Sequence, residues 1–314
     1  MKPIRLGMSS NIIMEIQSTL QKMGYPVGQI NGTYNEKTEE AVRSFQKDYE
    51  LTPDGVIGPK TLDVLKRFLL GYTTYRLKGS DTLYRLARRT GTLAEAIQTA
   101  NPGLLPGALP VGRLIVIPYK FNVVDTNINY TYDVLEHDIL GLAARYPFLQ
   151  VGVAGRSVMN RKLYYLRMGT GSHEVFYNAA HHAMEWITSP VIMKFAEEFC
   201  RAYAFGYSIE GYNPRDIWST SSIYLVPMVN PDGVDLVLNG VSSDNPYYTQ
   251  LIQWNMGSTD FSHTWDTNNH GVDLNHNYDA AWKDSVEAAA ELGITGPAPR
   301  RYPGPYPESE PESH

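Results

Sequence analysis

The sequence predicts a multidomain protein in which a small helical bundle and a second small module precede an α/β domain. Up to about residue 70, apolar residues repeat at helical spacing. Between residues 75 and 119, two short strand patterns enclose two helices, and after residue 120 strands and helices alternate. A chain of 314 residues has room for two or three domains of about 100 to 200 residues. We therefore expect domains at residues 1–71, 74–119 and 120–314.

The first predicted domain is a compact bundle of three helices. Two helices follow from apolar residues at helical spacing, namely Ile13, Ile16, Leu20 and Met23 in one and Ala41, Val42 and Phe45 in the other. A third helix is expected from Pro59 to Leu69, because proline is favoured in a first turn, and Gly71 is expected to close it.

The second predicted domain opens with a strand at residues 75–78 and closes with one at residues 113–118. The closing strand does not alternate, so we expect it to be buried on both faces. Asp81 is the expected N-cap of the first of two intervening helices. In the third domain, Leu163–Met168, Val175–Ala179 and Ile223–Val229 are expected to be buried strands, and Pro190–Ala204 a helix.

Composition excludes several classes of partner. A net charge of -6 without a run of Lys and Arg argues against nucleic-acid binding. The single cysteine, Cys200, allows no intramolecular disulfide and is expected in the core. The N-terminus has no apolar segment of the export-signal type, and no stretch of about 18 apolar residues predicts membrane insertion.

Two groups of motifs lie in the N-terminal modules. Gly32-Thr-Tyr, Thr38-x-x-Ala41-Val42, Phe45-Gln46 and Asp54-Gly-Val-Ile-Gly-Pro-Lys-Thr61 resemble the peptidoglycan-binding domain 1 family. Gly79-Ser-Asp81-Thr82-Leu83, Ala87-x-x-x-Gly91-Thr92 and Ala100-Asn101-Pro102 resemble the LysM module. The second resemblance implies a βααβ fold that binds N-acetylglucosamine-containing glycans. The alternative is that both modules are small folds serving as spacers.

The densest group of chemically active side chains follows the predicted strand at Val175–Ala179. His182 and Glu185 are three residues apart, so both side chains can turn to one side of a tight turn and offer a nitrogen and an oxygen to one cation. Alone this spacing is common on solvated helices, which is the competing interpretation.

The surrounding residues resemble the zinc carboxypeptidase family. The resemblance rests on His182-x-x-Glu185-Trp, Gly155-Arg-Ser-Val, Pro227-Met-Val-Asn-Pro-Asp-Gly233 and Gly271-Val-Asp-Leu-Asn275. It implies an α/β domain with a mixed sheet, incomplete in this chain, and Zn²⁺ as cofactor. It also implies that His182 and Glu185 are zinc ligands, that Asp273 orients His182, and that Asn275 contacts a substrate carboxylate.

The sequence departs from the family at several positions. His276 stands where the family has an arginine that grips the substrate carboxylate, and no arginine lies between Arg215 and Arg300. His270 or His276 is the expected substitute in substrate binding. The third zinc-binding histidine and the general-base glutamate cannot be placed. The acidic residues after Trp282 include Glu308, Glu310 and Glu312, in a Pro-rich tail that we expect, like His314, to be flexible and solvated. We therefore expect the base to lie beyond residue 314 in a longer protein.

The order of the modules resembles the γ-D-glutamyl-(L)-meso-diaminopimelate endopeptidases of spore-forming bacteria. This resemblance implies a peptidoglycan hydrolase, a zinc metallopeptidase acting on stem peptides, with the glycan and the stem peptide as partners. The alternative is a non-catalytic wall-binding protein. An amidase or glycosidase is disfavoured, since no His-Glu-x-x-His or Gly-x-Ser-x-Gly motif occurs. The expected location is the cell wall or spore, reached from the cytoplasm of a sporulating cell because no signal peptide is visible.

Overall fold

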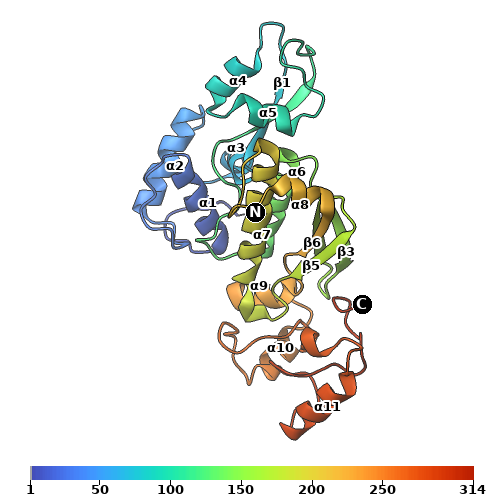
Figure 1. Ribbon diagram of the computed structural model, residues 1–314. Coiled ribbons are helices and arrows are strands. Elements are labelled where there is room, and N and C mark those ends of the chain that lie inside the picture. Colours follow the sequence, from blue (N-terminus) through green and yellow to red (C-terminus); the bar gives the residue numbers. More distant parts are fainter. Residues whose placement is uncertain (1) are drawn as a thin grey trace. The chain divides into compact units, whose positions relative to one another are not determined.

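The computed structural model describes residues 2–314 and divides the chain into two compact units. The first unit contains residues 1–128, 134–150 and 196–217, and the second contains residues 129–133, 151–195 and 218–314. Figure 1 shows the helices and strands of both.

The first unit begins with a three-helix bundle formed by α1 (Asn11–Lys22), α2 (Glu36–Asp48) and α3 (Pro59–Leu69). The predicted bounds of the third helix are confirmed, and Gly71 follows it with a φ of 71°. The apolar positions used to predict the first two helices are at most 1% exposed except Met23, which is partly buried and follows α1 as its C-cap.

Polar motif residues of this bundle hold its loops. Gln46 is 1% exposed; its Oε1 accepts the Gly55 N–H at 2.8 Å and its Nε2 donates to the Val56 carbonyl at 2.9 Å. The Tyr34 hydroxyl donates to the Gly55 carbonyl at 2.6 Å. Because these partners are backbone groups of a turn, the motif residues fix the turn that leads into α3.

The second module contains β1 (Tyr72–Arg76), α4 (Leu83–Thr90), α5 (Ala94–Ala100) and β2 (Leu114–Pro118), which confirms the βααβ order. The two strands pair antiparallel. β2 is not buried on both faces as predicted: Ile115 and Ile117 are 1% exposed but Leu114 is 56% exposed, since a two-stranded sheet has one covered face. The prediction of Asp81 as N-cap was wrong. Thr82 caps α4, and Asp81 instead accepts the Lys78 N–H.

Most of α6 (Tyr132–Arg145), the second half of α7 (Thr188–Phe205) and the start of α8 (Pro214–Thr220) also belong to the first unit. A Cβ at Gly141 of α6 would lie 2.5 Å from the Leu70 carbonyl oxygen, so glycine allows α6 to approach the end of α3. Arg145 donates from Nη2 to the Gly71 carbonyl at 2.7 Å. Cys200 is free and fully buried, as predicted.

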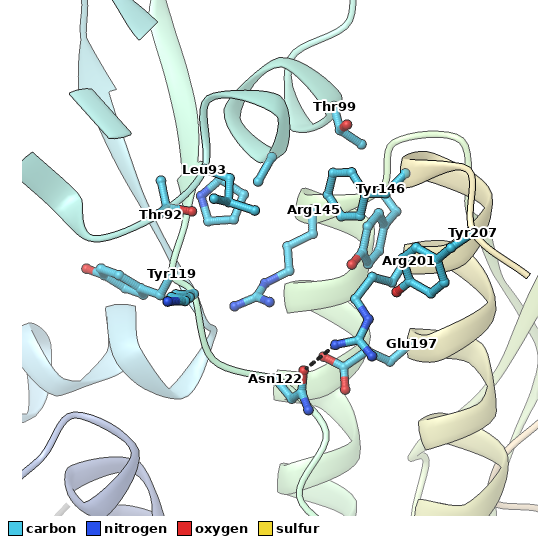
Figure 2. Close-up of a pocket in the computed structure, with 14 residues that line it drawn as sticks. Thr92, Leu93, Thr99, Tyr119, Asn122, Arg145, Tyr146, Glu197, Arg201 and Tyr207 are labelled. Carbon is cyan, nitrogen blue, oxygen red and sulfur yellow. Dashed lines mark hydrogen bonds between the residues drawn. The ribbon is translucent and has the colours of Figure 1, made fainter. Parts of the chain in front are cut away.

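A pocket of about 410 Å³ lies within the first unit (Figure 2). It is lined by the start of α5, the segment after β2, the end of α6 and the second half of α7. We call it the Arg145 pocket.

The second unit contains a four-stranded mixed sheet in the order β3 (Gln150–Arg156), β4 (Lys162–Met168), β6 (Ser221–Val226) and β5 (His173–Asn178). β4 pairs antiparallel and β5 parallel with β6. β5 is not a buried strand as predicted, because it lies at the sheet edge with Phe176 61% and Tyr177 53% exposed.

Short helices complete the second unit: η1 (Ala183–Glu185), α9 (Pro231–Asn239), α10 (Tyr248–Trp254), η2 (Leu274–His276) and α11 (Trp282–Glu291). A buried cluster of Ala183, Leu236, Leu251, Phe261 and Trp265 joins η1 to α9 and α10. Among residues 2–314, none of the helices combines the length and the apolar character that crossing a bilayer demands.

Candidate metal centre

The candidate metal centre begins where β5 ends. The Ala179 N–H donates to the Val226 carbonyl, and the Ala179 and Ala180 carbonyls accept the N–H groups of Val229 and Asn230. The chain that follows β5 is thereby tied to the chain that follows β6. Since these two strands are parallel, His181 and His182 emerge at their shared carboxyl end, where ligand sites of α/β sheets collect.

The Asn-Pro-Asp-Gly motif supports this segment from α9. Asn230 caps α9 by accepting the Gly233 N–H at 2.9 Å, and its Nδ2 donates to the His181 carbonyl at 3.2 Å. A Cβ at Gly233 would lie 2.5 Å from the Thr267 carbonyl oxygen and 2.8 Å from Ala183 Cβ. Glycine is therefore required for α9 to approach η1 this closely.

His182 lies between two carboxylates. Its Nδ1 is 3.1 Å from Glu185 Oε1, and its Nε2 is 3.4 Å from Asp273 Oδ1. Asp273 raises the pKa of His182 to about 9, Glu185 acts in the same direction, and partial burial opposes both. The two ring nitrogens thus have separate partners, an exposed carboxylate on one side and a buried one on the other.

Asp273 is the buried partner, with its side chain 4% exposed. Oδ2 accepts the Arg301 N–H at 2.9 Å, whereas Oδ1 has no hydrogen-bond partner of standard geometry among residues 2–314 and faces only His182 Nε2. Burial raises the pKa of this carboxyl, but His182 and the Arg301 N–H outweigh burial and lower it. Asp273 is therefore held as a carboxylate that points at the imidazole.

This donor set suits two positions of a zinc site. Ligands bound at about 2.0–2.1 Å in a tetrahedron lie roughly 3.3 Å apart, close to the 3.1 Å between His182 Nδ1 and Glu185 Oε1. A carboxylate on the other ring nitrogen is the usual support of a zinc-binding histidine. In the part of the chain that the structure describes, no group of three or more His, Cys, Asp or Glu side chains has the geometry to hold a metal.

Two other predicted site residues, Asn275 and His276, belong to η2 and follow Asp273 and Leu274 in the chain. His276 Nε2 is 4.0 Å from Asp273 Oδ2, and its Nδ1 is 3.2 Å from Ser285 Oγ. Asn275 is exposed on η2. His181 is directed to the Tyr278 hydroxyl, 3.0 Å from Nε2, and burial lowers its pKa.

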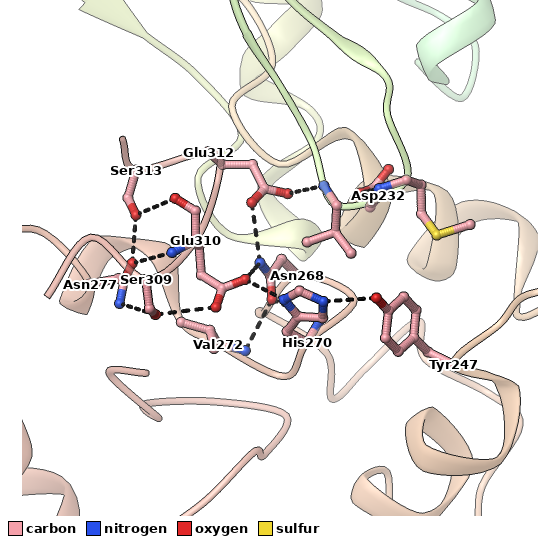
Figure 3. A network of polar contacts seen from close by, with 12 residues as sticks. Asp232, Tyr247, Asn268, His270, Val272, Asn277, Ser309, Glu310, Glu312 and Ser313 are labelled. Atoms are coloured by element: carbon pink, nitrogen blue, oxygen red, sulfur yellow. Dashed lines mark hydrogen bonds and ion pairs between the residues drawn. The ribbon is translucent and has the colours of Figure 1, made fainter. Parts of the chain in front are cut away.

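His270 belongs to a separate polar network (Figure 3). Its Nδ1 is 2.7 Å from Glu310 Oε2, and its Nε2 is 2.9 Å from the Tyr247 hydroxyl. The hydrogen bond to Glu310 is the main cause that raises the pKa of His270. Both ring nitrogens are occupied by the protein.

Arg300 is a cationic residue near the motif that sequence reasoning did not select. Its Nε is 3.1 Å from Asp266 Oδ2, and its Nη2 is 3.9 Å from the sulfur of Met184, inside the His182–Glu185 turn. The backbone carbonyl of Asp266, the residue paired with Arg300, accepts the Ala183 N–H. Asp266 is thereby connected to η1. No local pattern reveals this contact, because Arg300 and Met184 are 116 residues apart.

The prediction of a solvated tail is wrong for Glu310 and Glu312, which are 4% and 8% exposed. Glu310 accepts from Asn268 Nδ2 at 2.8 Å (Figure 3). Glu312 accepts the Val158 N–H at 3.1 Å, and burial raises its pKa to about 7. The physical reason is that buried amide and imidazole donors outweigh desolvation at Glu310 and lower its pKa, whereas at Glu312 burial outweighs the hydrogen bonds and favours the neutral carboxyl. Glu308 and His314 are exposed.

The Gly-Arg-Ser-Val segment is held from two directions. The Val158 N–H donates to Glu312, and the Met159 N–H donates to Asp232 Oδ2 at 2.8 Å. Asp232, 1% exposed, also accepts from Arg161 Nη1 at 2.9 Å. Two of the quoted motifs, the residues that follow Val158 and the tail are therefore joined by hydrogen bonds.

Comparison with known families and proteins agrees with these motifs. Residues 9–65 match the putative peptidoglycan binding domain family, residues 75–118 the LysM domain family, and residues 135–314 the zinc carboxypeptidase family. Over 193 residues the chain is 38% identical to gamma-D-glutamyl-L-diamino acid endopeptidase 1 of Lysinibacillus sphaericus, covering 62% of this chain and 48% of that protein.

Two further relatives come from Bacillus subtilis (strain 168). The uncharacterized protein YqgT is 36% identical over 187 residues, which cover 59% of this chain and 48% of YqgT. The spore cortex-lytic enzyme is 40% identical over 63 residues, covering 20% of this chain and 21% of that enzyme. The chain spans about half the length of the two peptidase-region relatives. The family match to residues 135–314 covers more than half of the chain and includes His182, Glu185 and Asp273, and the chain belongs to the zinc carboxypeptidase family.

Proposed function

We propose that this protein is a zinc-dependent peptidoglycan hydrolase that cleaves the γ-D-glutamyl-meso-diaminopimelate bond of stem peptides. In this proposal, domains at residues 1–71 and 74–119 bind the wall and residues 120–314 carry the peptidase domain. The observation that carries it is His182, which presents Nδ1 beside Glu185 while buried Asp273 faces Nε2. Two modules of peptidoglycan-binding families in the same chain support the substrate class.

The bond is proposed from the relative in Lysinibacillus sphaericus, whose name specifies a gamma-D-glutamyl-L-diamino acid endopeptidase. The similarity to a spore cortex-lytic enzyme in the N-terminal region supports action at the cell wall or spore. Neither the glycan nor the stem peptide requires a basic surface on the protein, which agrees with the net charge of -6.

The proposed metal ligands are His182 and Glu185. A bound zinc supplies a Lewis acid that polarises the scissile carbonyl and lowers the pKa of water. Asp273 keeps His182 in the tautomer that offers Nδ1, since the proton on Nε2 then faces a carboxylate. A complete catalytic site needs a third protein ligand and a general base to join these residues.

Substrate contacts are proposed for exposed residues around the pair. Asn275 and half-buried His276 follow Asp273 directly on η2 and are suited to a substrate carboxylate. Arg300 brings a guanidinium to the same turn through Asp266 and Met184. A guanidinium binds carboxylates in a two-pronged geometry, so Arg300 supplies the charge that the family's arginines would provide. His270 is a less favourable candidate for a substrate contact, because Glu310 and Tyr247 occupy both ring nitrogens.

A second candidate function is wall binding without catalysis. It is favoured by one observation: among residues 2–314, no three metal-binding side chains converge on a single point. In that case the two N-terminal modules carry the function, and the His182 turn is an inherited part of the fold.

Hydrolysis of L-Ala-γ-D-Glu-meso-diaminopimelate peptides, measured by mass spectrometry with added zinc, separates the two functions. For a form of the protein that includes the third ligand and the general base, the hydrolase predicts release of meso-diaminopimelate that His182→Ala abolishes and that His173→Ala, a change at an exposed histidine of β5, leaves intact. Wall binding alone predicts no release by any of the three proteins in that form, together with retention on purified sacculi.

A further inference from the structure

We propose that the Arg145 pocket binds a carboxylate-bearing amino sugar of the N-acetylmuramic acid class. The pocket has a volume of about 410 Å³, within the range of small-molecule sites at about 300–1,000 Å³. Its lining residues all belong to the first unit, whereas His182 and Glu185 belong to the second. The site is therefore separate from the proposed metal centre.

Arg145 gives the pocket a buried cation whose donors are only partly used. Arg145 is 7% exposed, and its Nη2 donates to the Gly71 carbonyl at 2.7 Å. Its Nε has no partner among residues 2–314. Figure 2 shows the Arg145 side chain crossing the middle of the pocket between Tyr119 and Tyr146. The charges of Glu197 and Asp138 act on this guanidinium, but no carboxylate forms a hydrogen bond with it in the described chain, so an anionic ligand can still use its remaining donors.

Arg201 brings a second guanidinium to the same pocket from α7. Nη1 donates to Asn122 Oδ1 at 3.3 Å, Nη2 is paired with Glu198, and Nε has no partner in the described chain. Lys120 adds a third cation to the lining. Two guanidinium groups can share one carboxylate through charge-assisted hydrogen bonds.

The lining carries more positive than negative charge. Arg145, Arg201 and Lys120 line the pocket together with one carboxylate, Glu197, which is 1% exposed, and Glu198 outside the lining neutralises part of the charge of Arg201. Glu197 is already engaged, because its Oε1 accepts the Val123 N–H at 2.6 Å. The excess of positive charge selects an acid over a neutral ligand.

Aromatic and apolar side chains form the rest of the wall. Tyr119, Tyr146, Phe205 and Tyr207 line the pocket, with Leu93 from the LysM module. Tyrosine rings offer an apolar face and a polar edge, which suits a pyranose ring with its hydroxyl groups. A ligand that combines a sugar ring with a carboxylate uses both parts of the lining.

The choice of sugar rests on the proposed function, since peptidoglycan contains both neutral and carboxylate-bearing amino sugars. N-acetylmuramic acid differs from N-acetylglucosamine by its lactyl ether, which carries the carboxylate. The stem peptide is a second source of carboxylates, and the experiment below distinguishes it from the sugar.

Isothermal titration calorimetry on the zinc-free full chain tests the proposal with N-acetylmuramic acid, N-acetylglucosamine and the dipeptide L-Ala-γ-D-Glu as probes. Arg201→Gln and Lys120→Gln remove cations from the pocket rim, while Arg67→Gln removes an exposed cation of α3 outside it. The zinc-free protein suffices because the pocket contains none of the proposed metal ligands, so loss of hydrolysis and loss of binding are separate outcomes.

N-acetylmuramic acid is expected to bind about tenfold more tightly than N-acetylglucosamine, and Arg201→Gln is expected to remove that difference, the effect of losing one charge-assisted hydrogen bond. Arg67→Gln should leave it unchanged. Equal affinity for the acidic and neutral sugars, or full acid preference in both Arg201→Gln and Lys120→Gln, would overturn the proposal. Binding of the dipeptide without binding of the acidic sugar would also overturn it.

Discussion

Asp273 controls which ring nitrogen His182 offers to a ligand. Its Oδ2 is fixed by the Arg301 N–H, so Oδ1 stays directed at Nε2. The carboxylate is buried, and water competes little for it. The orientation of His182 thus depends on a residue that lies 91 positions away, between a glycine-containing turn and η2.

Asp273→Asn is expected to weaken zinc binding by about 10- to 100-fold, because an amide is a poorer acceptor for the Nε2 proton and no longer raises the basicity of the ring. Competition titration with a zinc chelator measures the change. Asp279→Asn, at an exposed position on the same segment, is the control and should bind zinc normally. Equal affinity in both variants would contradict the orienting role.

Glu312 gives the second unit a pH-dependent stability. Burial raises the pKa of its carboxyl from 4.5 to about 7 in the folded chain. Between these values the folded chain holds a proton that the unfolded chain releases. The stability that this proton contributes is complete below about pH 4.5 and is lost as pH rises through 7.

Glu312→Gln is expected to remove this dependence. Relative to the unsubstituted chain, the variant should gain almost nothing near pH 4 and up to about 3 kcal/mol in the free energy of unfolding near pH 8. Urea unfolding followed by tryptophan fluorescence reports on the second unit alone, since all five tryptophans lie in it. The control is Glu308→Gln, at an exposed carboxyl. Parallel pH profiles for all three proteins would contradict this assignment.

At the scale of elements, the contact between α9 and η1 sets the position of the candidate centre. Asn230 caps α9 and donates to the His181 carbonyl, and Gly233 leaves room for Ala183. The Asn-Pro-Asp-Gly motif therefore acts through backbone geometry. It positions the segment that contains the proposed metal ligands and does not bind the metal itself.

Gly233→Ala is expected to destabilise the second unit by about 1–3 kcal/mol and to weaken zinc binding, because the added methyl group displaces η1 from α9. Thermal unfolding and zinc titration measure the two effects. Gly296→Ala is the matched control, since a Cβ there has no atom within 4 Å. Loss of stability with unchanged zinc affinity would show that η1 does not depend on this contact.

Local sequence patterns predicted helices better than sheet positions. The bounds Pro59–Leu69 follow from a proline, a periodic apolar face and a following glycine, all of which are local. The exposure of β5 could not be predicted, because an apolar run looks the same in a central strand and in an edge strand. The same reasoning explains β2, whose second face has no covering layer.

At the scale of the whole molecule, the candidate centre is assembled from distant segments. The spacing of His182 and Glu185 was visible in the sequence, and the resemblance to a family supplied Asp273. Arg300 and the burial of Glu310 and Glu312 were missed, because they arise from contacts across more than 40 residues with no periodic signal. Composition led to the wrong prediction for Glu310 and Glu312, because a Pro- and Glu-rich segment usually stays solvated.

Wall binding and metal binding are expected to be separable. The proposed ligands lie in the second unit, and the two peptidoglycan-binding modules lie in the first. Treatment with EDTA should therefore leave retention on purified sacculi unchanged while removing bound zinc. Release from sacculi by EDTA, reversed by zinc but not by magnesium, would instead place the wall-binding determinant in the metal-dependent part.

Zinc binding by the intact chain tests the central claim most directly. Equilibrium dialysis followed by elemental analysis should give one zinc per chain at saturation, with His182→Ala and Glu185→Gln each reducing the affinity and His173→Ala leaving it unchanged. Equal zinc affinity in the unsubstituted chain and in His182→Ala would contradict the claim that His182 and Glu185 are the metal ligands.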